Sequence, residues 1–280
     1  MIPSSLQISI VTYRPDLRLL DRVLRKLELA IGAARANGAL RSVHLALIDN
    51  SEDPKSGERV LEIGKARFRD AGVRVILRHG HANIGYGAAH NLVLHGTGSD
   101  YHLVMNPDVE VATDALLSAI RWMDAHPEVG ALAPAVRGPD GARHYLCKRY
   151  PAVLDLFLRG FAPRLLRLPF RKRLERYEMR DLVDVKPPRD VFDVPALSGA
   201  FMLVRREAID RTGGFDPAFF LYFEDYDWSI RLARITTTAY VPSVRIIHYG
   251  GDAARKGWRH VDWFVRSMFR FYGKHGWKWV

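Results

Sequence analysis

The sequence predicts an α/β protein with a Rossmann-like, mostly parallel sheet that is flanked by helices. Strand and helix patterns alternate through the first half of the chain, and polar residues follow directly after the expected strands. The 280 residues, 48% of them hydrophobic, are enough to bury a sizeable core. We expect one large domain at 1–252, with a basic insert at 147–190, and a C-terminal aromatic and basic helical appendage at 253–280.

Apolar spacing predicts each element in turn. The expected strands of the first half lie at 6–12, 44–48, 73–77 and 101–105. The expected helices between them lie at 17–31, 54–71, 87–95 and 114–125. Asp16 stands where the first helix needs an N-cap. The second half is expected to contain strand-like residues at 191–204, a helix at 223–233, strands at 238–241 and 244–247, and a helix at 258–275.

Charge and cysteine content limit the possible partners. The formal net charge of +11 indicates an anionic partner: nucleic acid, a phospholipid surface or a phosphorylated substrate. We expect no nucleic-acid partner, because no known binding module is recognisable and the basic residues gather in the insert and the tail. Cys147 is the single cysteine, which favours a reducing compartment. Without a recognisable secretory leader or spanning segment, we expect a cytoplasmic protein that meets a membrane only at its surface.

Polar residues after the expected strands carry candidate chemistry. Asp49 follows the second strand, and its carboxylate could accept the imide N–H of uracil or thymine, or could only cap a turn. The small residues around Asn83 and Gly85 could approach phosphate at a helix start, or form an ordinary glycine-rich turn. Asn106 and Asp108 follow the fourth strand, where a carboxylate could hold Mg²⁺ or Mn²⁺ or merely form a Pro-Asp turn.

Two further segments come from the second half. Glu224, Asp225 and Asp227 lie within four positions among aromatic residues. They could supply a general base, or complement the dipole at the start of a helix. His248 follows the last expected strand and could complete a metal site with Asp108, although a lone histidine is often structural.

In this order, these segments resemble the family-2 bacterial glycosyltransferases of the GT-A fold, especially the rhamnosyltransferases of polysaccharide assembly. The resemblance runs from about residue 7 to 251. The matching segments are Val11-Thr12-Tyr13, Asp49-Asn50-Ser51, Asn83-Ile84-Gly85-Tyr86-Gly87 with Asn91, Asn106-Pro107-Asp108, Ser198-Gly199-Ala200-Phe201-Met202, Gly213-Gly214-Phe215-Asp216, Phe219 to Asp227, and His248.

The resemblance implies a nucleotide-sugar site at the strand ends. Asp49 would bind the pyrimidine base, with Thr12 and Tyr13 lining its pocket. Asn83 and Gly85 would border the nucleotide and its phosphates. The donor expected from the resemblance is thymidine diphosphate-rhamnose (dTDP-rhamnose), with a UDP-sugar as the alternative.

The resemblance also implies a metal and a catalytic base. Asp108 would be the remaining carboxylate of the family's Asp-x-Asp motif and would hold Mg²⁺ or Mn²⁺ with His248, while Asn106 replaces the first aspartate. Asp225 would be the base of an inverting single displacement, with Glu224 as the alternative. The backbone around Ser198 and Gly199 would border the donor or acceptor sugar.

The appendage and the competing functions leave alternatives open. Aromatic and basic residues alternate in the tail, which suits a helix on anionic lipid and a lipid-linked saccharide acceptor. The same residues could instead pack on the large domain or on a second copy in a homodimer. A sugar-nucleotide oxidoreductase lacks support because Thr12-Tyr13-Arg14-Pro15 stands where a dinucleotide fingerprint is needed. A non-catalytic nucleotide-sugar-binding module is the remaining alternative.

Overall fold

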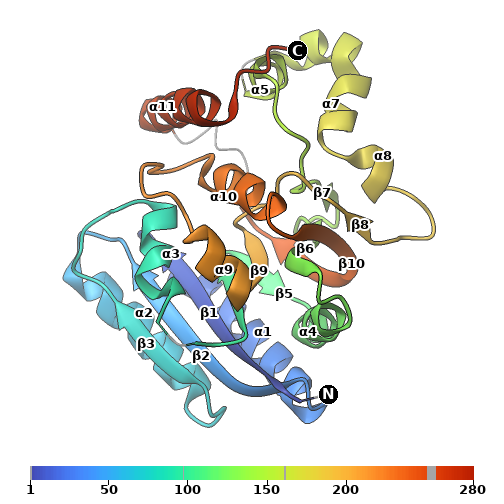
Figure 1. Cartoon of the computed structure of the whole chain (residues 1–280). Helices are drawn as coiled ribbons and strands as arrows, with labels where there is room; N and C mark the ends of the chain where they lie inside the picture. The colour runs from blue at the N-terminus through green and yellow to red at the C-terminus, as the bar shows by residue number, and fades with distance from the viewer. Residues whose placement is uncertain (1, 97, 161, 251–256) are drawn as a thin grey trace.

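The computed structural model describes residues 2–96, 98–160, 162–250 and 257–280, which form one sheet with helices on both faces (Figure 1). Its strands are β1 (Ser4–Thr12), β2 (Leu40–Asp49), β3 (Arg74–Arg78), β4 (Tyr101–Met105), β5 (Val109–Val111), β6 (Val129–Arg137), β7 (Arg143–His144), β8 (Val191–Phe192), β9 (Phe201–Arg205) and β10 (Thr237–His248). Its helices are α1 (Leu17–Ala36), α2 (Pro54–Phe68), α3 (Tyr86–Leu94), α4 (Ala115–Ala125), α5 (Val153–Gly160), α6 (Arg164–Arg167), the 3-10 turn η1 (Leu168–Phe170), α7 (Arg171–Tyr177), α8 (Arg180–Val183), α9 (Arg206–Thr212), α10 (Glu224–Ala233) and α11 (Trp258–His275).

The sheet has the strand order β3-β2-β1-β4-β9-β6-β10-β5. Pairing is parallel across β3-β2-β1-β4 and between β6 and β10. By contrast, β9 is antiparallel to β4 and β6, and β5 is antiparallel to β10. The predicted α/β fold is confirmed, and its parallel core is the first half of the chain. Because Phe201 pairs with Met105, the loop before β9 lies beside the residues that follow β4.

Apolar side chains bury both faces of the sheet, which gives three layers. Helices α1, α2 and α4 pack on one face in the largest buried cluster. Helices α3, α9 and α10 cover the other face. The Asp16 carboxylate accepts hydrogen bonds from the backbone N–H groups of Arg18 and Leu19, so the predicted N-cap of α1 is confirmed.

The end of the sheet differs from the sequence prediction. The runs at 238–241 and 244–247 are not two strands but parts of β10. The register of β10 against β6 shifts between Val241 and Arg245, where Pro242 has no N–H to donate. One long strand with an irregularity therefore replaces the predicted pair.

Other differences follow from local sequence. The run at 191–204 is divided into β8 and β9, with the loop that contains Gly199 between them. Strand β6 was not predicted because it contains Gly130 and Pro134, which usually argue against a strand interior. Pro134 pairs with Val241 beside the irregularity of β10, where a missing donor is tolerated.

The insert and the end of the chain lie together above α10 in the view of Figure 1. Helix α11 has the predicted bounds. Its buried residues Phe271 and Tyr272 pack with Phe219 and Phe223 of the loop before α10, so one face of the appendage packs on the rest of the chain. Within the described ranges, no helix combines the length and apolarity that crossing a bilayer requires.

Candidate functional site

A cleft of about 760 Å³ opens at the carboxyl ends of β1, β2 and β4. The predicted site residues that line it are Thr12, Tyr13, Asn83, Gly85, Asn106 and Asp108. Further lining residues come from the loop before α10 and from the first turns of α11: Phe220, Leu221, Trp258, Arg259, His260 and Trp263. Ligands of open α/β sheets bind at this edge, and the appendage contributes to the cleft wall.

Asp49 ends β2 directly opposite Thr12 of β1 and is only 1% exposed. Its Oδ1 accepts hydrogen bonds from the hydroxyls of Thr12 and Ser51, each at 2.8 Å. Its Oδ2 is buried and has no hydrogen-bond partner among the described residues. A buried acceptor without a donor is unfavourable, which makes Asp49 a candidate for binding a hydrogen-bond donor, although it does not itself line the cleft.

The loop before α3 brings its backbone close to the loop before α10. Gly85 has a φ of 93°, and a Cβ at this position would collide with the carbonyl oxygen of Phe220. The side-chain oxygen of Asn83 accepts the Gly85 N–H at 3.1 Å, and the Asn50 amide donates to the Gly85 carbonyl at 3.0 Å. These bonds fix a turn that only glycine can form here.

Tyr86 connects the cleft to the start of α10. Its hydroxyl lies 2.7 Å from Asn106 Oδ1 and 2.8 Å from the Gly199 carbonyl, and shares its hydrogen between them. The Gly199 N–H donates to Asp225 Oδ2 at 3.1 Å, and the Ser198 hydroxyl accepts a backbone N–H in the same turn. Burial and nearby carboxylates raise the pKa of Tyr86, so the phenol remains a donor. The sequence prediction assigned Tyr86 no role of its own; its position in a glycine-rich turn was the available signal.

Glu224 and Asp225 form the first turn of α10, after an unusual backbone conformation. Tyr222 and Phe223 have left-handed φ values of 68° and 64°, which residues with side chains rarely adopt. The chain therefore turns sharply before α10, and this turn sets the direction in which the two carboxylates point.

The two carboxylates have different hydrogen-bond environments. Burial raises the pKa of both, and the Asp225 charge raises the pKa of Glu224 further. Asp225 accepts backbone N–H groups from Gly199 and Tyr226, at 3.1 and 2.9 Å, which favours its ionised form. Glu224 Oε2 is buried without a partner among the described residues. These contacts favour the ionised form of Asp225 over that of Glu224.

Asp108 and His248 converge because β5 pairs with the end of β10. Asp108 Oδ1 lies 3.4 Å from His248 Nε2 and is buried without a hydrogen bond to any described residue. A Cβ on Gly250 would come within 2.6 Å of Asp108 Oδ2 and 2.7 Å of His248 Nε2. No group of three or more His, Cys, Asp or Glu side chains suited to a metal occurs in the described ranges. The pair fits a divalent cation that takes its other ligands from a diphosphate and water.

Asp227, the third carboxylate of the acidic motif, lies away from the cleft. It is fully buried and contacts Arg231 at 2.9 Å, Lys274 at 2.7 Å and His275 at 2.8 Å. Burial alone would raise the pKa of Asp227, but these partners outweigh burial and lower it. Asp227 therefore attaches α10 to α11.

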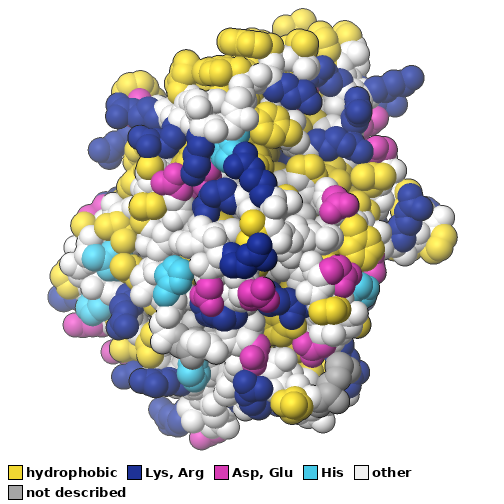
Figure 2. Space-filling model, in the orientation of Figure 1, with side chains coloured by type: hydrophobic (Ala, Val, Ile, Leu, Met, Phe, Trp, Pro, Cys, Tyr) yellow, Lys and Arg dark blue, Asp and Glu magenta, His cyan; other side chains and the backbone are white. Residues whose placement is uncertain are grey.

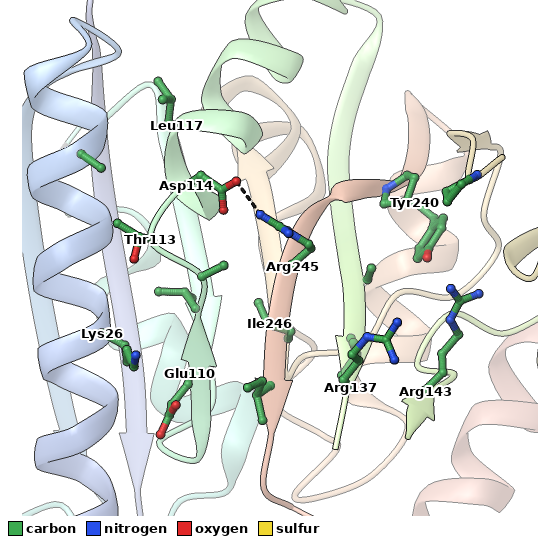
Figure 3. Close-up of a pocket in the computed structure, with 18 of the residues that line it drawn as sticks. Lys26, Glu110, Thr113, Asp114, Leu117, Arg137, Arg143, Tyr240, Arg245 and Ile246 are labelled. Atoms are coloured by element: carbon green, nitrogen blue, oxygen red, sulfur yellow. Dashed lines mark hydrogen bonds and ion pairs between the residues drawn. The ribbon is translucent and has the colours of Figure 1, made fainter. Parts of the chain in front are cut away.

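A second cavity of about 870 Å³ lies between α1, α4 and the strands β5, β10 and β6 (Figure 3). Two of its arginines have acidic partners: Arg245 reaches Asp114 at 2.6 Å, as Figure 3 shows, and Arg143 reaches Asp184 at 2.6 Å. Arg137 donates to the Gly141 carbonyl at 2.7 Å. None of the predicted site residues, all of which the structure describes, lines this cavity. Of the predicted residues with an unpartnered carboxylate oxygen, Asp108 lines the cleft at the strand ends, whereas Asp49 and Glu224 line neither of these two cavities.

Solved structures support the fold. The chain is similar to the mannosyltransferase PcManGT from Pyrobaculum calidifontis in complex with GDP-Man and Mn²⁺, with a TM-score of 0.62 and 14% identity over 98% of this chain and 64% of that chain. It is also similar to GalNAc-T7 with UDP, GalNAc and Mn²⁺, with a TM-score of 0.62 and 16% identity over 98% of this chain and 50% of that chain. This chain therefore spans less than two thirds of either protein, and at such identities the likeness shows the GT-A fold alone.

Sequence relatives go further. The N-acetylglucosaminyl-diphospho-decaprenol L-rhamnosyltransferase of Mycobacterium tuberculosis is 33% identical over 264 residues, covering 87% of this chain and 76% of the relative. Rhamnosyltransferase WbbL of Escherichia coli is 29% identical over 175 residues, covering 61% of each chain. The family model described as "Glycosyl transferase family 2" matches residues 31–213. The chain therefore belongs to glycosyl transferase family 2, as the motif order predicted.

Proposed function

We propose that this glycosyltransferase moves rhamnose from dTDP-rhamnose to a hydroxyl of a lipid-linked saccharide, with inversion, in the assembly of a cell-surface polysaccharide. The observation that carries the proposal is the hydrogen-bonded path from the cleft residue Asn106 through Tyr86 and Gly199 to the Asp225 carboxylate. This path supports the assignment of Asp225 as a base close to a cleft that suits a nucleotide sugar. The activity named for the Mycobacterium tuberculosis relative supports rhamnose as the sugar.

The donor base would be bound at Asp49. Its free Oδ2 can accept the imide N–H that thymine and uracil share, whereas adenine and cytosine present no such N–H there. Guanine also carries a ring N–H of this kind, so this contact alone fits thymine, uracil or guanine. The resemblance to rhamnosyltransferases favours thymine, with a UDP-sugar as the second candidate. Thr12 and Ser51 hold the other carboxylate oxygen and so keep Oδ2 directed away from them.

Asp225 would take the proton of the acceptor hydroxyl as that oxygen attacks the anomeric carbon. A positioned base contributes roughly 10²–10⁴-fold to such a step. Asp225 is the member of the pair whose ionised form accepts two backbone N–H groups, which supports it rather than Glu224 as the base. The sugar–phosphate bond breaks in the same displacement, so no covalent intermediate with the enzyme is needed.

Asp108 and His248 would hold Mg²⁺ or Mn²⁺, since their side chains converge around Gly250. When bound, such an ion offsets the charge that develops on the leaving nucleoside diphosphate. Tyr86 and Asn106 would border the sugar or its phosphates from the other side of the cleft.

The acceptor would carry a lipid diphosphate, as the name of the Mycobacterium tuberculosis relative specifies for that protein. A lipid-linked acceptor requires contact with the inner face of a membrane, and we propose that this contact is peripheral.

The test is calorimetric titration with dTDP, UDP and ADP, each with and without Mn²⁺, followed by a transfer assay. We expect Mn²⁺-dependent binding of dTDP, weaker binding of UDP, and transfer of rhamnose to N-acetylglucosaminyl-diphospholipid. Tighter UDP binding with transfer from a UDP-sugar would replace the donor. Binding of either nucleotide without transfer or hydrolysis of any sugar donor would favour a non-catalytic binding module.

A further inference from the structure

Helix α6 and turn η1 expose a cluster of large apolar side chains. Leu165, Leu166 and Leu168 are 78%, 61% and 64% exposed, and Phe170 is also exposed. They lie within six consecutive positions, so the apolar surface is nearly continuous. Contiguous apolar surface of this kind usually marks a contact site, because water solvates it poorly.

The end of the chain adds aromatic residues to the same region. The Val153 N–H donates to the Lys278 carbonyl at 2.8 Å, and the Leu154 N–H donates to the Trp279 carbonyl at 3.2 Å. These bonds hold the chain end against α5, with Trp277 and Trp279 exposed and stacked at 5.1 Å. We call the surface formed by Leu165, Leu166, Leu168, Phe170, Trp277 and Trp279 the apex.

Basic residues surround the apex. Between residues 157 and 173 the sequence contains six basic side chains and no acidic one. Three of the six form ion pairs with carboxylates outside this stretch: Arg159 with Glu178, Arg171 with Glu175, and Arg173 with Asp155. In Figure 2, hydrophobic side chains gather at the top of the molecule, and Lys and Arg side chains lie directly below and beside them. Exposed Leu, Phe and Trp residues surrounded by Lys and Arg are typical of surfaces that enter the interface of an anionic bilayer.

We propose that the apex docks on an anionic lipid bilayer, with α6 and η1 rather than the flank of α11 as the main apolar contact. The proposal rests on the lipid-linked acceptor proposed above, whose headgroup lies at such a surface. A protein partner would need acidic residues placed opposite these basic side chains, whereas the surface of an anionic bilayer is negatively charged throughout. Trp258 and Trp263 at the other end of α11 line the cleft, so the docked apex and the cleft belong to one packed unit.

The test is sedimentation with vesicles of phosphatidylcholine alone and of equal parts phosphatidylcholine and phosphatidylglycerol. We expect the full chain to bind the anionic vesicles and not the neutral ones. The triple variant Leu165→Ser, Leu166→Ser, Leu168→Ser should bind them at least about tenfold more weakly, because it removes the apolar contact and keeps every charge. These side chains are exposed, so folding should be preserved.

The matched control is Leu29→Ser with Leu92→Ser, two leucines that are 49% and 45% exposed outside the apex. It should bind anionic vesicles as the wild type does. Equal binding by the triple variant, or no binding by the wild type, would overturn the proposal. The proposal would also be overturned if light scattering showed that the wild type is a dimer and that the triple variant is a monomer, and if neither bound vesicles. A second copy of the chain would then cover the apex.

The result can be separated from the proposed function by a transfer assay with a short-chain, water-soluble acceptor. The triple variant should transfer to this acceptor at the wild-type rate. If vesicle binding follows the expected pattern and no variant or wild type transfers sugar, the proposed function fails while the docking surface stands.

Discussion

Asp225→Asn should abolish the base and keep the site largely intact. Loss of a general base costs roughly 10²–10⁴-fold in rate. That range corresponds to about 3–5 kcal/mol of activation free energy. The Asn side chain can still accept one of the two backbone N–H groups, from Gly199 or Tyr226, and faces the other with its NH₂. We therefore expect a loss of about 1–3 kcal/mol in stability, which a folded domain tolerates.

The assay is the rate of rhamnose transfer at saturating dTDP-rhamnose, with donor affinity measured separately by calorimetry. Glu224→Gln is the matched variant, since Gln resembles the protonated carboxyl group, and it should keep the rate within about tenfold. Because burial raises the pKa of Asp225, the wild-type rate should fall as the pH drops through a value above the ordinary aspartate pKa of about 3.9. Wild-type transfer by Asp225→Asn, or a larger loss in Glu224→Gln, would refute this assignment.

Three further substitutions test other parts of the site. Asp49→Asn should weaken dTDP binding roughly 10- to 100-fold, because it removes a charged acceptor, and an unchanged calorimetric Kd would reject base binding there. Gly250→Ala should weaken Mn²⁺-dependent dTDP binding, because the added Cβ would displace Asp108. Gly273→Ala is the control, since a Cβ there meets open space and should leave binding unchanged. Equal calorimetric Kd values for the two variants would contradict the metal assignment. Asp227→Asn should lower the free energy of unfolding by about 2–3 kcal/mol in urea denaturation, less than if both partners were fully buried, because Arg231 and Lys274 are partly exposed; a change near zero would show that α11 is anchored otherwise.

The first half of the fold can be predicted from sequence because its strands are short apolar runs with polar residues directly behind them. The run at 101–105, followed by Asn106 and Asp108, is an example. The strands that follow β4 are harder to predict, since β5 has three residues and β6 contains Pro134. Their strand conformation comes from pairing with β10, which lies more than a hundred residues away in sequence. The local sequence pattern of β5 and β6 does not indicate pairing with so distant a strand.

The site could be predicted as a set of residues but not as a set of contacts. Adjacent carboxylates look equivalent in the sequence, yet Asp225 faces Gly199 while Asp227 faces α11. Asn91 belongs to the same motif pattern as the site residues, but its amide holds the backbone of Phe215 by two hydrogen bonds and never enters the cleft. The motif residues therefore indicate the family. Only their contacts in the structure separate candidate ligand-binding residues from residues that support the backbone of the fold.

Helix α11 shows why composition alone could not decide whether the tail packs on the protein or contacts lipid. Its buried face carries Phe271 and Tyr272, while Asp227 binds Lys274 near its end. Packing on the domain therefore accounts for Phe271, Tyr272 and Lys274, whereas Trp258, Phe269, Trp277 and Trp279 are exposed. The 18 residues of α11 extend about 27 Å, from the cleft wall at Trp258 toward the apex. Because packing fixes this helix along its length, a bilayer bound at the apex would also fix the direction in which the cleft faces it. The packed face of α11 and the lipid contact proposed for the apex therefore involve different residues, so either interaction could occur without the other.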